Sequence, residues 1–429
     1  MTHYKSSVFF AITILLAIAA IGISAQQTAP DAPAGFQTPP LGQNQGSQSV
    51  SNGIAEPPGD TFALDQTRFE RRNGIDDGLG PVFNASSCAD CHLNPVTGGP
   101  SQITEIRAGH LDPTTGAFLN PSIPITGSTI PITDRSIVDD RAVCPEAHEQ
   151  LPDTENIRAL RAVLSTLGDG FVEAIDDNTL LNIAAYQAQT THGHIHGEAV
   201  NVAIFEAAGQ TGVGRFGWKD QHRSLLSFSA DAYLNEMGIT SRLRPKDTTT
   251  VCKTTTDPED QLDANGLGDI DHFAQFMRGT KVPPPDPVLA ATADAQAGQA
   301  LFSKIGCATC HVPAIVTAPP GTLVNGGMFV VPDALGNKTI RPYGDFLLHD
   351  VGTGDSIVQG GPPDTINKLR TAPLWGVRTK TRFMHDLKSE SLADAINRHR
   401  GEASEVIENF HERLTPDQQK QIIAFLNSL

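Results

Sequence analysis

The sequence is poor in basic residues and lacks apolar runs beyond its N-terminus. Of its 429 residues, 31 are lysine or arginine and 48 are aspartate or glutamate, so the formal net charge is −17. Such an acidic surface disfavours nucleic acid and anionic membranes as partners, but it suits a basic partner protein. Past residue 23 no apolar run is long enough to span a bilayer, so we expect no membrane span in the mature chain.

One apolar run does occur, from Val8 to Ile23, and it follows Lys5. It predicts a cleavable signal peptide over residues 1–25, which would place the mature protein in the periplasm. Ile23 stands where a signal peptidase usually meets a small residue, so an uncleaved anchor is the alternative. Residues 26–58 are rich in Gln, Pro, Gly and Ser and predict a flexible leader.

The remaining chain is too long for one ordinary core. The segment "KVPPPDP" (281–287) favours a linker, because consecutive prolines break both helices and strands. We therefore expect an N-terminal domain over 59–199, a loop-rich insertion or connecting region over 200–290 and a C-terminal domain over 291–429. Apolar residues at helical spacing predict helices within 156–175, 177–189, 224–238 and 293–306.

The six cysteines divide into two groups. Cys144 and Cys252 stand alone and could pair as a disulfide, which the sequence by itself does not prove. The other four form "CADCH" (88–92) and "CATCH" (307–311), and export to an oxidising compartment disfavours free thiols. These two motifs admit three interpretations.

A thiol redox pair would sit at a helix start in a βαβ setting, which the pattern does not show. A zinc site could use four converging thiolates, but it does not explain why a histidine follows each pair. Covalent haem explains all three residues, because two thiols about one helical turn apart reach the two vinyl groups and the histidine ligates the iron. The motifs therefore predict two haem c groups, held by Cys88, Cys91 and His92, and by Cys307, Cys310 and His311.

With these motifs placed, the chain resembles the di-haem oxidoreductase family, which is related to bacterial di-haem cytochrome c peroxidases. The stretches that carry the resemblance are "GLGPVFNASSCADCH", "GRFGWK", "NEMGITS", "LFSKIGCATCH", "DFLLHDVG" and "LRTAPLWGVRTKTRFMHD" with "SLADAINRHRGEA". They span roughly residues 78–429. The resemblance implies an all-α fold of two cytochrome c-like domains, each with one covalent haem.

The sixth ligand decides whether a haem is closed or reactive. Ser391 predicts a helix start and Gly401 a helix end, which places Leu392, Ile396 and His399 on one face. A core histidine bonded to a carbonyl is the alternative for His399. The resemblance favours His399 as a ligand of the second haem iron, 14 residues after a "HDG"-like motif at His385.

Three other residues compete for this position: His349, Met384 and His385. We interpret Met384 as a packing residue and the two histidines as partners of haem propionates or backbone. Related peroxidases bind calcium between their domains near this segment. Leu387 replaces the glycine of the motif here, so the resemblance leaves calcium open.

The resemblance also implies an open, reactive first haem. Histidines 192, 194 and 196 of "THGHIHGEA" suggest an exposed loop, although one of them could reach this haem. Trp218 is the candidate aromatic bridge between the haems, with Trp375 as its rival. Glu173 is the candidate acid–base residue, Glu198 is weaker, and ordinary core or surface roles are the alternatives for these side chains.

These features predict a peroxidase-type enzyme that reduces hydrogen peroxide or another small oxidant, with electrons relayed through the second haem. A small cytochrome or cupredoxin would be the electron donor. Two alternatives remain: an oxidase or oxygenase acting on a protein or organic substrate, and an electron carrier with both haems closed.

Overall fold

The computed structural model describes residues 29–35, 51–253 and 260–429. The predicted signal peptide lies outside the described residues, and only 29–35 and 51–58 of the predicted leader are described. Among the described residues, no helix is long and apolar enough to cross a membrane. The predicted domain boundaries stay a prediction.

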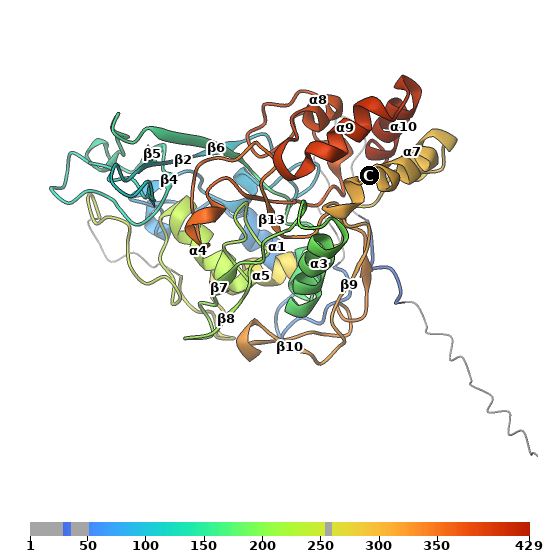
Figure 1. The fold of residues 1–429 in the computed structure, drawn as a ribbon. Coiled ribbons are helices and arrows are strands. Elements are labelled where there is room, and N and C mark those ends of the chain that lie inside the picture. Colours follow the sequence, from blue (N-terminus) through green and yellow to red (C-terminus); the bar gives the residue numbers. More distant parts are fainter. Residues whose placement is uncertain (1–28, 36–50, 254–259) are drawn as a thin grey trace, which may run out of the picture.

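Figure 1 shows helices grouped at the centre and at the C-terminal end, with a small sheet at the opposite side. The helices are α1 (Phe62–Glu70), α2 (Asp169–Glu173), α3 (Asp177–Thr190), α4 (Leu225–Met237), α5 (Asp269–Gly279), α6 (Pro287–Ala290), α7 (Ala293–Lys304), α8 (Leu392–Asn397), α9 (Ser404–Glu412) and α10 (Pro416–Leu426). The strands are β1 (Val82–Phe83), β2 (Thr104–Leu111), β3 (Phe118–Leu119), β4 (Ile137–Val138), β5 (Arg141–Ala142), β6 (Ile157–Ala162), β7 (Asn201–Ala203), β8 (Thr211–Val213), β9 (Ile315–Val316), β10 (Leu323–Val324), β11 (Phe329–Val330), β12 (Thr339–Ile340), β13 (Leu348–His349) and β14 (Leu369–Arg370).

The fold is mixed, with 31% helix and 14% strand, so the all-α prediction was wrong. The largest departure is β6, which occupies residues that the apolar spacing assigned to a helix. It pairs antiparallel with β2, from Thr104 opposite Ala162 to Gly109 opposite Ile157. Short apolar runs do not distinguish helix from strand, and here the cross-strand pairing with a distant segment decides.

Three other predicted helices are confirmed as α3, α4 and α7. Helix α4 has clear local signals at both ends. The Ser224 hydroxyl accepts a hydrogen bond from the Ser227 backbone N–H, and Gly238 ends the helix with a φ of 70°. In these segments the local sequence and the final packing agree.

Helices α1, α4 and α5 enclose an aromatic core near the first C-x-x-C-H motif. The ring of Phe69 in α1 packs on Phe276 of α5 at 4.6 Å between centroids. Tyr233 of α4 contacts Phe273 of α5, and its hydroxyl donates to Asp269 at 2.9 Å. These contacts fix the wall behind the first motif.

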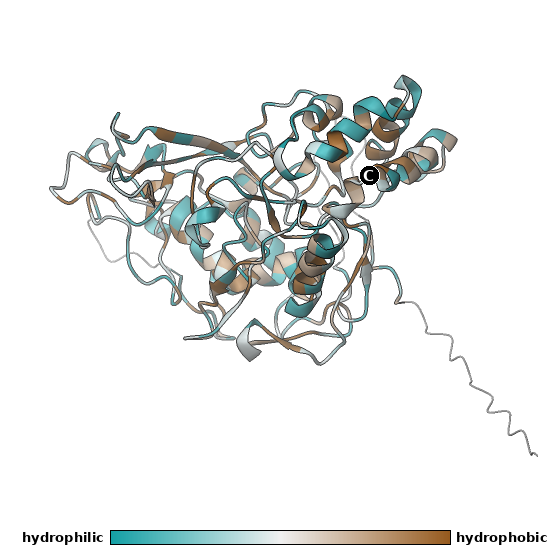
Figure 2. Ribbon diagram, viewed as in Figure 1, coloured by the Kyte–Doolittle hydropathy of each residue, from teal (hydrophilic) through white to brown (hydrophobic). Residues whose placement is uncertain are grey.

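The C-terminal core lies between α7 and α10, close to the second motif (Figure 1). The rings of Phe302, Tyr343 and Phe425 contact one another there. The two helices approach so closely that a Cβ on Gly298 would lie 1.9 Å from the Gln421 carbonyl oxygen. Figure 2 shows hydrophilic and hydrophobic residues alternating along the C-terminal helices, as helices with one buried face require.

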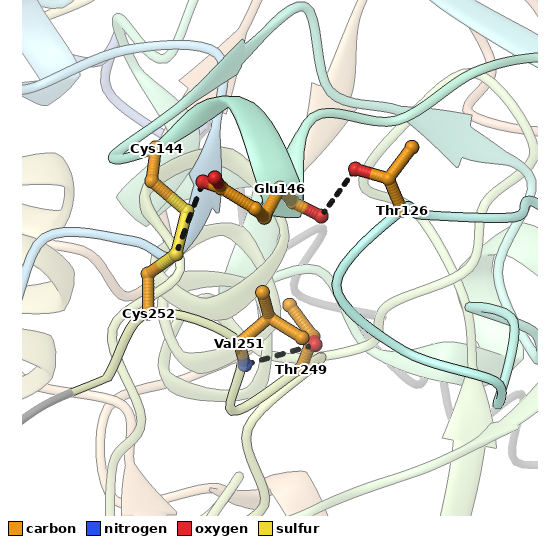
Figure 3. Close-up of a disulfide and its surroundings, with 6 residues drawn as sticks. All are labelled: Thr126, Cys144, Glu146, Thr249, Val251 and Cys252. Atoms are coloured by element: carbon orange, nitrogen blue, oxygen red, sulfur yellow. Dashed lines mark hydrogen bonds between the residues drawn. A yellow bond between two sulfur atoms is a disulfide. The ribbon is translucent and has the colours of Figure 1, made fainter.

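Cys144 and Cys252 form a disulfide, the pairing that the sequence allowed (Figure 3). Their Cα atoms lie 6.4 Å apart and the bridge closes a separation of 108 residues. Glu146 lies beside the bridge, and its carbonyl accepts a hydrogen bond from the Thr126 hydroxyl at 3.5 Å (Figure 3). The disulfide thus ties the sheet region after β5 to the segment that leads toward α5.

Candidate functional site

The first C-x-x-C-H motif forms a single 3₁₀ turn over Cys88–Asp90. The Ser87 hydroxyl accepts from the Asp90 backbone N–H at 3.1 Å, and the His92 N–H donates to the Cys88 carbonyl at 2.9 Å. This turn places both thiols and the following imidazole on the same side of the backbone. All three line one cavity of about 500 Å³.

The His92 ring lies in the wall of this first cavity. It contacts Phe69 edge-on, at 6.2 Å between ring centroids. Burial lowers the pKa of His92 to about 4, so the imidazole is neutral at physiological pH. A neutral imidazole is the form that ligates metal.

The second motif repeats this geometry after α7. Gly306, with a φ of 108°, turns the chain out of the helix into the 3₁₀ turn Cys307–Thr309. The His311 N–H donates to the Cys307 carbonyl at 3.0 Å. Cys307, Cys310 and His311 line a second cavity of about 230 Å³.

His399 lines the second cavity opposite His311. The ring centroids of these two histidines lie 6.5 Å apart with an interplanar angle of 63°. Nδ1 of His311 donates to the Tyr343 carbonyl at 3.0 Å, and Nδ1 of His399 donates to the Ala395 carbonyl at 2.8 Å. Both Nε2 atoms therefore carry the lone pair, in the tautomer that a bound metal requires.

The helix that carries His399 is shorter than predicted, because α8 ends at Asn397. Its start is as predicted, since the Ser391 hydroxyl accepts from the Asp394 N–H at 3.0 Å. Arg398 then leaves the helix to form two bonds with Asp386, at 2.7 and 2.9 Å. This ion pair holds the turn that presents His399.

His349 is fully engaged with carboxylates. Its Nε2 lies 2.8 Å from Asp345 Oδ2 and its Nδ1 lies 2.8 Å from Glu402 Oε2. Burial lowers its pKa, but the adjacent Asp345 and Cys310 outweigh that effect and raise the pKa well above 6.5. A histidine with both nitrogens so engaged has neither a lone pair for a metal nor an unengaged N–H to donate to a propionate.

Met384 and His385 both line the second cavity. The buried Nδ1 of His385 has no hydrogen-bond partner within the described part of the chain. Its ring contacts Trp218 at 6.0 Å between centroids. An unpartnered nitrogen at a cavity wall is a suitable place for an acidic group of a ligand, such as a propionate.

The turn after His385 shows no cation site. Both carboxylate oxygens of Asp386 bond Arg398, and no cluster of three metal-ligating side chains in the described residues includes this turn. Calcium at this position has no support here.

Trp218 lines both cavities. Its indole N–H donates to the Ala162 carbonyl, at the end of β6, at 2.8 Å. Its rival Trp375 lines neither cavity and packs near Gly168 instead. The structure therefore brings Trp218, and not Trp375, to the wall between the two motifs.

The structure does not bring Glu173 or Glu198 to either cavity. Glu173 is fully buried, with its carboxylate bonded to Arg278 at 2.6 and 3.0 Å and to the Leu225 N–H at 2.8 Å. Glu198 pairs with Lys368 at 2.5 Å. Histidines 192, 194 and 196 are exposed and line neither cavity.

Two other glutamates, which the sequence did not single out, line the first cavity: Glu105 of β2 and Glu236 of α4. Glu105 accepts from Arg107 Nε at 2.6 Å, and Arg107 holds the pKa of Glu105 below its usual value despite burial. Burial and the adjacent Glu105 raise the pKa of Glu236 well above its usual value. The pKa values of the two carboxyls are thus shifted in opposite directions, down for Glu105 and up for Glu236.

The two cysteine pairs open onto different cavities, so they do not converge on one four-thiolate zinc site. Burial raises the pKa of the Cys91 and Cys307 thiols to about 12, the opposite of what a reactive thiol pair needs. A half-buried C-x-x-C turn with its histidine at a cavity wall fits covalent haem.

A family description, "Di-haem oxidoreductase, putative peroxidase", matches residues 144–429. The chain belongs to the di-haem oxidoreductase family. Membership implies two haems. The match contains the second motif, His399 and Trp218, whereas the first motif precedes it in the sequence.

No curated protein matches the chain. Among solved structures, hydrazine synthase from Kuenenia stuttgartiensis is 12% identical with a TM-score of 0.35, over 92% of this chain and 99% of that one. A MauG-like protein associated with microbial copper homeostasis is 18% identical with a TM-score of 0.25, over 38% of this chain and 52% of that one. With TM-scores this low, neither likeness carries an argument about activity.

Proposed function

We propose that this di-haem oxidoreductase is an exported c-type peroxidase that reduces hydrogen peroxide at the first cavity and stores an electron at the second. The observation that carries the proposal is the difference between the two cavities. His399 faces His311 across the second cavity, whereas no second histidine of the described residues lines the cavity of His92. A closed site transfers electrons and an open one binds an oxidant.

The residues fit the haems that the family implies. Cys88 and Cys91 would hold the first haem, with His92 as its axial ligand, and Cys307 and Cys310 would hold the second. His311 and His399 would each supply a nitrogen ligand to the second haem. Haem iron with an open axial position supplies peroxide binding and electron transfer when it is present.

Glu236 is the proposed proton donor for peroxide reduction. It lines the first cavity and holds its proton, because Glu105 beside it is ionised and paired with Arg107. A general acid is needed where an O–O bond breaks, and a carboxyl with a raised pKa retains its proton at neutral pH. Glu236, with Glu105 beside it, thus replaces Glu173 as the candidate acid–base residue.

Trp218 is the proposed bridge for electrons between the cavities. It lines both of them, and the hydrogen bond from its indole to Ala162 fixes the ring in place. His385 packs on its edge from the side of the second cavity. An aromatic ring held in this position shortens the path between the two sites.

The proposal includes export to the periplasm and a small electron-carrier protein as donor. The net charge of −17 favours a donor with a basic surface, because complementary charge raises the rate of encounter. The donor would be a small cytochrome or a cupredoxin. This part of the proposal predicts that the reduction rate falls steeply with ionic strength.

The test is rapid mixing of the haem-loaded protein with hydrogen peroxide while the Soret band is recorded. A fast spectral change, in the oxidised or half-reduced protein, is expected if the first site is open. No change in either state would mean that both sites are closed, with Met237 or Met277 of the first cavity as the ligand, and would make the protein an electron carrier. Turnover that needs an organic or protein substrate instead of an electron donor would indicate an oxidase.

A further inference from the structure

A third group of potential ligands lies outside both cavities, between α1 and α5. Asp60, Asp65 and His272 are all buried, with exposed fractions of 7%, 0% and 5%. One potential ligand atom from each lies within 4.8 Å of the others. Nδ1 of His272 lies 2.7 Å from Asp65 Oδ1 and 3.3 Å from Asp60 Oδ2.

This group has more negative charge than its surroundings balance. Burial, and then the charges of Asp65 and Asp60, raise the pKa of the nearby Glu56 to about 7. Arg68 and Arg71 are nearby, but their ion pairs go to Asp269. Among the described residues, the ion pairs of Asp60 and Asp65 are with His272 alone.

Asp65 Oδ2 is buried and has no hydrogen-bond partner in the described residues, and the same holds for Oε1 of the nearby Glu56. Asp60 Oδ2 has only the 3.3 Å ion pair with His272 Nδ1. Buried oxygens without partners are costly unless a ligand completes them. Burial and the neighbouring Asp60 raise the pKa of Asp65 to about 6, against the lowering effect of His272. A bound cation would remove the repulsion and satisfy the free oxygens at once.

We propose that Asp60, Asp65 and His272 form a binding site for one divalent transition-metal ion, such as Zn²⁺ or Mn²⁺. A set of one imidazole nitrogen and several carboxylate oxygens suits these ions. Calcium does not suit it, because calcium takes six to eight oxygen ligands. The other ring nitrogen of His272, Nε2, lies 3.5 Å from Asp263 Oδ2. This carboxylate is therefore placed to orient the imidazole from the side opposite the proposed ion.

The site would stabilise the wall of the first cavity. Asp65 lies in α1 and His272 in α5, and these two helices carry Phe69 and Phe273. Phe69 contacts both Phe273 and the His92 ring, at 6.1 and 6.2 Å between centroids. A metal ion joining the helices would hold Phe69 against the first motif, which is a structural role and not a redox one.

The experiment uses the full haem-loaded protein, treated with a chelator and then titrated with Zn²⁺ or Mn²⁺ alone. Elemental analysis after removal of free metal should find one equivalent of the ion beyond the two haem irons. The melting temperature should rise on addition of the ion. Calcium should produce neither effect.

The Asp65→Asn variant keeps the shape of the side chain and removes one charged ligand. We expect its affinity for the ion to fall at least about tenfold. The matched control is His110→Gln, since His110 forms a pair with Glu155 at the same 2.7 Å but without a second carboxylate. It should bind the ion as the unmodified protein does, and haem absorbance per protein should confirm that both variants are folded.

No binding of Zn²⁺ or Mn²⁺ by the unmodified protein would overturn the proposal, even if Asp65→Asn fails to fold. Equal binding by the unmodified protein and Asp65→Asn would also overturn it, because the ion would then lie elsewhere. The inference does not depend on peroxide reactivity, so the two proposals succeed or fail separately.

Discussion

The imidazole rings of His311 and His399 face one another across the second cavity, 6.5 Å apart between centroids. Both rings line that cavity, so they would be placed to hold the second haem between them. Both rings are oriented by hydrogen bonds from Nδ1 to backbone carbonyls. In both rings Nε2 is therefore the nitrogen with the free lone pair, as the proposed ligand role requires.

The first prediction concerns His399. Replacing it, in His399→Ala, should convert the second haem from low-spin to high-spin, because one axial nitrogen is lost. Optical and electron paramagnetic resonance spectra measure the change. His196→Ala is the control, since His196 is exposed and lines neither cavity. An unchanged low-spin spectrum in His399→Ala would move the ligand to Met384.

The second prediction concerns Trp218. Trp218→Phe should slow electron exchange between the haems and leave each haem spectrum unchanged, because the residue lines both cavities. The lost hydrogen bond to Ala162 should lower stability by about 1 kcal/mol. Rapid mixing of half-reduced protein measures the exchange. Trp375→Phe serves as the control, and equal slowing in both variants would argue against a bridge at Trp218.

The third prediction concerns Glu236. Glu236→Gln should lower the rate constant for the reaction with peroxide roughly 10²- to 10⁴-fold, as expected for loss of a general acid. Glu198→Gln should leave that rate unchanged, since Glu198 lines neither cavity. A rate in Glu236→Gln that equals that of the unmodified protein would exclude the carboxyl as proton donor.

The pH dependence provides a fourth prediction. Burial and the charge of Glu105 raise the pKa of Glu236, so its proton is present at neutral pH and is lost as the pH rises through the raised pKa. The peroxide rate of the unmodified protein should therefore fall on the alkaline side. The rate of Glu236→Gln should not follow that titration, and a parallel fall in both proteins would assign the titration to another group.

The fifth prediction concerns the disulfide. Removing it, in the Cys144→Ser, Cys252→Ser double variant, should lower the free energy of unfolding by about 2–5 kcal/mol, because the bridge closes a long loop. Denaturant unfolding measures the loss. The haem spectra should be retained, since neither cysteine lines a haem cavity. Unchanged stability in the double variant would mean that the bridge does not form in solution.

The sequence predicted the features that depend on short spacing. Cys88, Cys91 and His92 lie within one turn, so their common direction follows from local geometry alone. The start of α8 at Ser391 and the presence of α4 and α7 follow from capping residues and apolar spacing in the same way. His399 could be suggested because it lies within one turn of the end of that helix.

Contacts between residues far apart in the chain could not be predicted from such short spacings. Glu105 and Glu236 come from β2 and α4, and only the packing of the sheet against the helix brings both to the first cavity. Glu173 was the acid–base candidate from the sequence, but in the structure its carboxylate is paired with Arg278, 105 residues away. The helix expected over 156–175 gave way to β6, because pairing with β2 outweighed the local pattern.

The sequence by itself therefore predicts where each haem would be attached, because two thiols and an imidazole at this fixed short spacing lie together whatever the fold around them. Only the tertiary structure decided how the two sites differ. It placed His399 opposite His311, an acidic pair beside His92 and Trp218 between the two cavities. Each of these placements brings together residues that are far apart in the chain. The distances between them are therefore set only when the whole chain has packed.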